Sequence, residues 1–168
     1  GYGQVIPTYE VVIFDEAHLL EETANSYFSI QVSSYRLLDL FRDISWEMTG
    51  VEKKENSPAR QLQNLGKLSA QFFELFPPGN KRQRLQPETF PPEFHQRWLE
   101  LLQSLEQLIA ELFRQIDQSE GLSSCHRRAL EINQALELIL EQRDPNYVYW
   151  YETRGRGKFL WASPGQVA

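Results

Sequence analysis

Residues 91–113, PPEFHQRWLELLQSLEQLIAELF, decide the fold class of this 168-residue chain. Apolar side chains recur there every three or four residues, which places them on one stripe of a helix. The pair Pro91-Pro92 favours a helix start, and a helix from Glu93 to about Asp117 would be about 35 Å long. Because the stripe needs other helices to cover it, the sequence predicts a helical bundle. The stripe consists of Phe94, Trp98, Leu101, Leu105, Leu108 and Leu112.

Three further segments repeat the same helical spacing and supply the partners of that bundle. The first carries Leu37, Phe41, Ile44 and Met48. The second opens near Pro58 and carries Leu62, Leu65, Phe72 and Phe76. Before the fourth segment, Gly121 is interpreted as a signal that ends the preceding helix and Ser123-Ser124 as the signal that begins the next one. Its stripe consists of Cys125, Ala129, Ile132, Leu136 and Ile139.

Two linkers and a hairpin complete the predicted architecture. Residues 50–57 are rich in charge and residues 77–92 hold five prolines, so neither can continue a helix. Residues 147–161 contain two aromatic-rich runs separated by a glycine-bearing loop, which indicates a β-hairpin. From Ala17 up to this hairpin we expect helical segments and linkers. The predicted fold class is mainly α, an antiparallel helical bundle with a short β-hairpin.

Composition excludes several classes of protein. A net charge of −6 argues against a domain that wraps nucleic acid over its whole surface, although a local basic patch remains compatible with it. Cys125 is the only cysteine, so these residues hold no disulfide, multi-cysteine zinc site or iron-sulfur site. We expect a soluble protein of the reducing cytoplasm, since no apolar run approaches the roughly 18 residues of a membrane helix and no secretory signal is present.

The residues with the clearest chemistry follow the apolar run Val11 to Phe14, which is typical of a strand buried on both faces of a parallel sheet. In nucleotide hydrolases of the P-loop type, an acid at the carboxyl end of such a strand holds the Mg²⁺ of the bound nucleotide, and an adjacent carboxylate can polarise the attacking water. Asp15 would serve the metal and Glu16 the water. A simpler interpretation is that the acid pair opens a helix, where carboxylates favour the positive end of the dipole.

Residues 12–21, VIFDEAHLLE, resemble motif II, the Walker B element, of the DinG/XPD-like DNA helicases of superfamily two. Residues 147–164, which contain YVYWYE, RGRG and LWASP, resemble the segment that leads the chain back into the first motor domain. The resemblance implies that residues 1–24 and 146–168 belong to a RecA-like motor domain. Residues 25–145 would be the helical arch domain inserted between them.

The resemblance also implies an activity, which is ATP-dependent unwinding of DNA with 5′ to 3′ movement along a single strand, in repair or replication. It assigns Asp15 to Mg²⁺, Glu16 to catalysis, and His18 to the coupling of hydrolysis to movement. No phosphate-cradling Gly-Lys-Ser/Thr sequence occurs, because Gly66-Lys67 and Gly157-Lys158 are followed by Leu and Phe. We therefore expect this chain alone to be inactive, with ATP and Mg²⁺ bound by a longer parent protein.

Two features bear on the parent. The iron-sulfur cysteines of the family would lie upstream of motif II, so a cluster is compatible with the parent and not with these residues. The only methionine is Met48 and the chain opens at Gly1, which indicates a segment of a longer protein. The excised strand from Val11 to Phe14 would expose apolar surface, and we expect it to pack on the bundle, pair with the hairpin or drive dimerisation.

Two basic clusters are candidate contacts for single-stranded or forked DNA: Lys81, Arg82 and Arg84 in the second linker, and Arg154, Arg156 and Lys158 in the hairpin. The second cluster lies beside Tyr149, Trp150 and Tyr151, and proteins that bind single strands combine positive charge with aromatic stacking. Both clusters also fit a structural role, because basic loops are mostly solvated and hairpin aromatics mostly pack across strands.

Alternative functions remain open at this stage. The helical region could be a protein-interaction module that docks repair or replication partners, with an acidic surface that repels DNA. Positions 126–128, His-Arg-Arg, fit helix surface charge, and Cys125 fits a small core residue. A metal site from His18, His95, His126 and Cys125 has no close-spaced ligand pair to support it. No catalytic constellation is complete enough for a self-contained helical enzyme.

Overall fold

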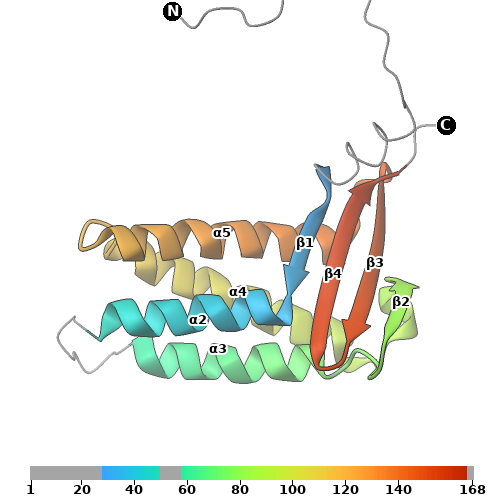
Figure 1. The fold of residues 1–168 in the computed structure, drawn as a ribbon, viewed down its shortest axis with the longest axis horizontal. Coiled ribbons are helices and arrows are strands. Elements are labelled where there is room, and N and C mark those ends of the chain that lie inside the picture. The colour runs from blue at the N-terminus through green and yellow to red at the C-terminus, as the bar shows by residue number, and fades with distance from the viewer. Residues whose placement is uncertain (1–27, 50–57, 166–168) are drawn as a thin grey trace, which may run out of the picture.

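The computed structural model describes residues 28–49 and 58–165 (Figure 1). Its helices are α2 (Ser34–Met48), α3 (Pro58–Phe73), α4 (Glu93–Arg114) and α5 (Glu120–Glu141). The strands are β1 (Ile30–Ser33), β2 (Lys81–Arg84), β3 (Tyr147–Arg154) and β4 (Gly157–Pro164), and a short 3-10 helix, η1, covers Pro87–Thr89. The predicted class, mainly α with a short hairpin, is confirmed.

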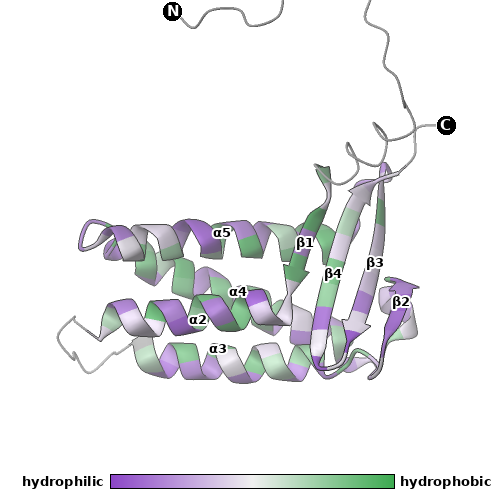
Figure 2. Ribbon diagram, in the orientation of Figure 1, coloured by the Kyte–Doolittle hydropathy of each residue, from purple (hydrophilic) through white to green (hydrophobic). Residues whose placement is uncertain are grey.

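The four helices lie side by side and bury the predicted stripes. Helix α4 contacts α3 and α5, and α2 contacts the same two helices. All six residues of the α4 stripe are buried, as are the stripes of α2 and α5, apart from the half-buried Met48 at the end of α2. Figure 2 shows apolar and polar segments alternating along each helix, as expected when one side of a helix is buried.

Serine side chains fix where two of the helices begin. The Ser33 hydroxyl accepts a hydrogen bond from the Arg36 amide at 3.1 Å, and that of Ser119 accepts one from the Leu122 amide at 3.0 Å. The prediction that the last helix starts after Ser123-Ser124 is therefore wrong. Ser119 caps α5, Glu120 favours the positive end of the dipole, and Gly121 lies inside the helix.

The hairpin forms the centre of a four-stranded antiparallel sheet in the order β1-β4-β3-β2. Two residues connect β3 to β4, and the first, Gly155, has a φ of 58°, as in hairpin turns that place glycine first. The hairpin prediction is confirmed. The two outer strands were not predicted: β1 lies in a region expected to be helical, and β2 lies in the proline-rich linker.

The sheet packs across the end of the bundle where α2 begins and α5 ends (Figure 1). Its inner face buries Val32, Leu160 and Tyr151, and these side chains join the helices in one hydrophobic core. Phe76, which follows α3, lies 5.2 Å from the Tyr151 ring and 4.9 Å from the Phe90 ring. Residues 147–164 therefore fold together with the helices, and none of the helices in residues 28–49 and 58–165 covers the outer face of the sheet. The boundary with a motor domain stays a prediction.

Several predicted residues lie outside the described part of the chain. These are the strand from Val11 to Phe14 and the acidic motif with Asp15, Glu16 and His18. Among residues 28–49 and 58–165, no helix has the length and apolar character needed to cross a membrane. Within the same ranges, no group of three or more His, Cys, Asp and Glu side chains could hold a metal ion.

Candidate nucleic-acid interface

Strand alternation divides the hairpin side chains between the two faces of the sheet. Tyr149 and Tyr151 are buried on the inner face, where their hydroxyls donate to the Asp144 carbonyl at 3.1 Å and to Gln83 Oε1 at 2.6 Å. Burial raises the pKa of both phenols. Of the three aromatic residues proposed to stack on a strand, only Trp150 lies on the outer face, so the two tyrosines belong to the core.

Trp150 has a partner that was not identified as a site residue from the sequence. Trp161 lies directly opposite it on β4, and the two indoles stack with ring centroids 5.7 Å apart and an interplanar angle of 6°. Both rings are partly exposed. The alternation of Trp161 with the buried Leu160 and Ala162 is the sequence signal that could have placed it there.

Arginines from both basic clusters meet on this face. Arg82 lies opposite Glu152 in the register of β2 with β3, and its guanidinium carbon is 5.0 Å from the centroid of the Trp150 ring. Arg84 lies opposite Trp150 in the same register. The Arg154 guanidinium carbon is 5.3 Å from the centroid of the Phe159 ring. We call this set the outer-face cluster: Arg82, Arg84, Arg154, Trp150, Trp161 and Phe159.

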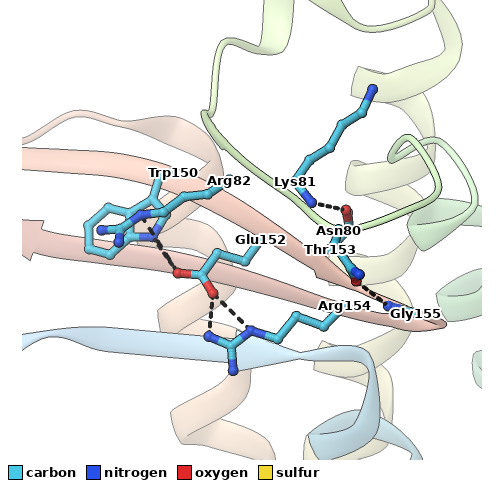
Figure 3. Close-up of polar contacts among 8 residues, drawn as sticks. All are labelled: Asn80, Lys81, Arg82, Trp150, Glu152, Thr153, Arg154 and Gly155. Carbon is cyan, nitrogen blue, oxygen red and sulfur yellow. Dashed lines mark hydrogen bonds and ion pairs between the residues drawn. The ribbon is translucent and has the colours of Figure 1, made fainter.

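Glu152 lies between two of these arginines (Figure 3). Arg154 donates to its Oε2 through Nε, at 3.1 Å, and through Nη2, while Arg82 Nε lies 3.7 Å from its Oε1. Trp150 Nε1 also donates to Oε1, at 3.4 Å. Burial alone would raise the pKa of Glu152, but the hydrogen bonds from Arg154 and Trp150 and the two positive charges more than offset it. The pKa therefore lies below its ordinary value and the carboxylate is charged at neutral pH.

The remaining predicted basic residues do not join the outer-face cluster. Lys158 is 9% exposed, and its ammonium donates to the Pro77 carbonyl at 3.1 Å, so it is unavailable to a strand on the outer face. Burial also lowers the pKa of Lys158. The side chain of Lys81 points away from Glu152 in Figure 3, and Arg156 is exposed in the turn of the hairpin.

An additional aromatic residue extends the surface beyond the sheet. Tyr35, in the first turn of α2, meets Phe159 edge-on with ring centroids 6.0 Å apart, and it is 48% exposed. A Cβ atom on Gly157 would lie 2.5 Å from a ring carbon of Tyr35. The glycine at this position therefore permits the tyrosine to lie against the hairpin.

Residues weighed for other roles have structural explanations. Arg128 Nη1 lies 2.7 Å from Asp43 Oδ2, so this cation of α5 pairs with an acid of α2. Cys125 is 2% exposed, and burial raises the pKa of its thiol. It is a core residue and a poor nucleophile at neutral pH.

No protein-family model matches the chain. The whole chain is similar to part of a protein named ATP-dependent DNA helicase YoaA from Escherichia coli, with 31% identity over 172 residues. It is also 31% identical over 169 residues to a protein of the same name from Haemophilus influenzae. Each comparison covers 100% of this chain and 26% of the relative. The chain is thus homologous to one segment of these proteins and spans about a quarter of their length.

Proposed function

We propose that this chain is a segment of an ATP-dependent DNA helicase, and that its described part guides a single DNA strand across the outer face of the sheet. The observation that carries the proposal is that Arg82, Arg84 and Arg154 share the outer face of the sheet with the stacked pair Trp150 and Trp161, with Arg82 over the Trp150 ring. Similarity to two proteins named as DNA helicases supports DNA as the ligand.

The chemistry of the outer-face cluster suits a flexible, unpaired strand. Guanidinium groups bind phosphate oxygens through pairs of parallel hydrogen bonds, and indole rings offer apolar surface to unpaired bases. The chain as a whole has a net charge of −6, so electrostatic attraction of a DNA strand requires a local basic surface such as this one. A strand lying along β3 would pass the arginines and the indoles together.

The motor part of the proposal rests on the resemblance of residues 12–21. Asp15 would hold Mg²⁺, Glu16 would activate water, and His18 would couple hydrolysis to 5′ to 3′ movement, with the phosphate loop supplied by the longer protein. Residues 25–145 would be the arch domain. In the longer protein, Glu16→Gln should reduce ATP hydrolysis at least a hundredfold while the protein stays folded. A normal rate of hydrolysis would remove the motor assignment.

Strand contact is tested by fluorescence anisotropy of a labelled oligonucleotide titrated with this chain at a series of salt concentrations. The triple variant R82A/R84A/R154A should lose at least tenfold in affinity at low salt. The dependence of log affinity on log salt should become less steep, by about 0.7 for each phosphate that is no longer neutralised. The control variant R42A/R60A/R114A removes the same charge from the helices and should bind within about threefold of the unmodified chain. Equal losses in both variants would mean that the sheet has no special role.

A second candidate function, docking of a repair or replication protein, has one observation in its favour. Trp46 is 77% exposed and Leu38 is 54% exposed on α2. If the chain binds no single-stranded DNA at low salt, and Trp46→Ala abolishes binding of a purified repair or replication protein, this function replaces strand guiding.

A further inference from the structure

An acid, Glu152, lies among the residues of the outer-face cluster, where a phosphate-binding surface would be expected to hold none. Glu152 lies between Arg82 and Arg154, and its carboxylate contacts both (Figure 3). The sequence offers no sign of this arrangement, since Arg82 and Glu152 are far apart in the chain and meet only through the pairing of β2 with β3.

We propose that Arg82 and Arg154 form a fork for one backbone phosphate of a single strand, and that Glu152 competes with that phosphate for the two guanidinium groups. The proposal rests on the proposed function and adds a regulation of the same surface. An internal competitor would lower the affinity of this surface for the strand. Weak binding suits a surface along which the strand must move.

Exposure separates the anion from the cations. The side chain of Glu152 is 12% exposed, whereas those of Arg82 and Arg154 are 69% and 65% exposed. The carboxylate therefore lies beneath the guanidinium groups, and solvent reaches them from above. A phosphate can approach from that side without displacing the strand pairing.

Hydrogen-bond capacity leaves room for a phosphate. A guanidinium has five N–H donors in a planar fork. Arg154 uses Nε and Nη2 on the carboxylate, and Arg82 directs only Nε toward it. The remaining donors of both groups are available to phosphate oxygens. Arg82 also lies over the Trp150 ring, which limits the orientations that its guanidinium can adopt.

Two roles for Glu152 predict opposite outcomes. If the carboxylate mainly holds the arginines in position, its removal frees them and weakens strand binding. If it mainly competes, its removal takes away a like charge close to the phosphate and releases donors that the phosphate can use. Since both arginines also have aromatic contacts that orient them, we expect competition to dominate.

The test compares Glu152→Gln with the unmodified chain in anisotropy titrations of a labelled single-stranded oligonucleotide. The control is Glu111→Gln, which makes the same charge change on α4 in an acid that pairs with Arg114. We expect Glu152→Gln to bind about three- to tenfold more tightly at low salt, with a steeper dependence on salt and slower dissociation. The control should stay within about twofold of the unmodified chain.

Several outcomes would overturn the inference. If Glu152→Gln binds equally or more weakly while the unmodified chain binds with a marked salt dependence, the competitor role fails and the proposed function stands. If R82A/R84A/R154A binds as tightly as the unmodified chain, strand guiding fails and the fork fails with it. Should Glu152→Gln not fold, R82K/R154K tests the fork, because lysine keeps the charge without the paired donors. That variant should lose at least threefold, and unchanged affinity would overturn the fork.

Discussion

Phe76 is the residue whose truncation should most strongly weaken the packing of the sheet against the bundle. It is 2% exposed and lies three residues beyond the end of α3. Its ring lies between 4.9 and 6.1 Å from five other aromatic rings, measured between centroids: Phe72, Phe73, Phe90, Phe94 and Tyr151. Those rings come from α3, α4, β3 and the segment after η1, so one side chain links two of the helices to the sheet.

The expected cost of Phe76→Ala follows from what surrounds the ring. Truncation of a fully buried phenylalanine costs about 3–5 kcal/mol, because the apolar packing of the ring is removed and a cavity remains. Five neighbouring rings place this site at the upper end of that range, since each favourable aromatic pair adds roughly 0.5–1.5 kcal/mol and the pairs are not additive. Domains are stable by only about 5–15 kcal/mol, so the decrease would be a large share of the total.

Urea unfolding followed by circular dichroism and by tryptophan fluorescence measures this decrease in stability. Phe113→Ala is the matched control, because Phe113 is 63% exposed, and the free energy of unfolding should change by about 0.5 kcal/mol or less. We expect the two signals to move together in Phe76→Ala, since Trp150 and Trp161 lie in the sheet and Trp46 and Trp98 lie in the helices. A decrease no larger than in the control would refute a core shared by sheet and bundle.

Three further predictions concern single residues. Gly155→Ala should lower the free energy of unfolding by about 1–2 kcal/mol, because φ is 58° at this position. Gly66→Ala, at an open position in α3, should raise it by about 0.5–1 kcal/mol, because alanine favours a helix more than glycine does. Chemical denaturation measures both changes. The pKa of Glu152 in the folded chain lies below its ordinary value of 4.5. Its carboxylate therefore stabilises the fold above pH 4.5, and this contribution disappears as the pH falls through the pKa of the folded state. Glu152→Gln should therefore flatten the acid limb of the stability curve, and an unchanged limb would count against the two ion pairs. Cys125 should react with a thiol reagent at pH 8 only after unfolding, and rapid labelling of the native chain would show that it is not buried.

The helices were predictable because each one buries a stripe with helical spacing. In α4, the six apolar residues that define the prediction are all buried, and the helix ends at Arg114, close to the expected end. The hairpin was predictable because aromatic and β-branched residues flank a glycine turn. These signals are local, so each can be recognised in a short stretch of sequence without knowledge of the rest of the fold.

The outer strands could not be predicted from local signals. All four residues of β2 are exposed, and its Lys-Arg-Gln-Arg sequence has no apolar face. These residues form a strand because their backbone pairs with the edge of β3. The charged side chains of β2 disfavour further pairing with another chain. In β1, the alternation of Ile30 with Val32 covers too few residues to stand out from the helical pattern around it.

The candidate site was predictable in part, because its residue types were visible and their placement was not. Lys158 was predicted to lie with Arg154 in an exposed loop. It lies in β4, where the same alternation that buries Leu160 turns the Lys158 side chain inward. The same alternation places Trp161 outward beside Trp150. The meeting of Arg82 with Glu152 depends on strand pairing, which no local pattern specifies.

Photo-crosslinking tests the central claim, strand binding on the outer face of the sheet, most directly. An oligonucleotide carrying 5-iododeoxyuridine would be bound to the chain at low salt and irradiated, and crosslinked peptides would be identified by mass spectrometry. We predict crosslinks to Trp150, Trp161 and Tyr35, which disappear when R82A/R84A/R154A is used. Crosslinks confined to the exposed sides of α3 and α5, with none on residues 147–164, would contradict strand binding on the outer face of the sheet.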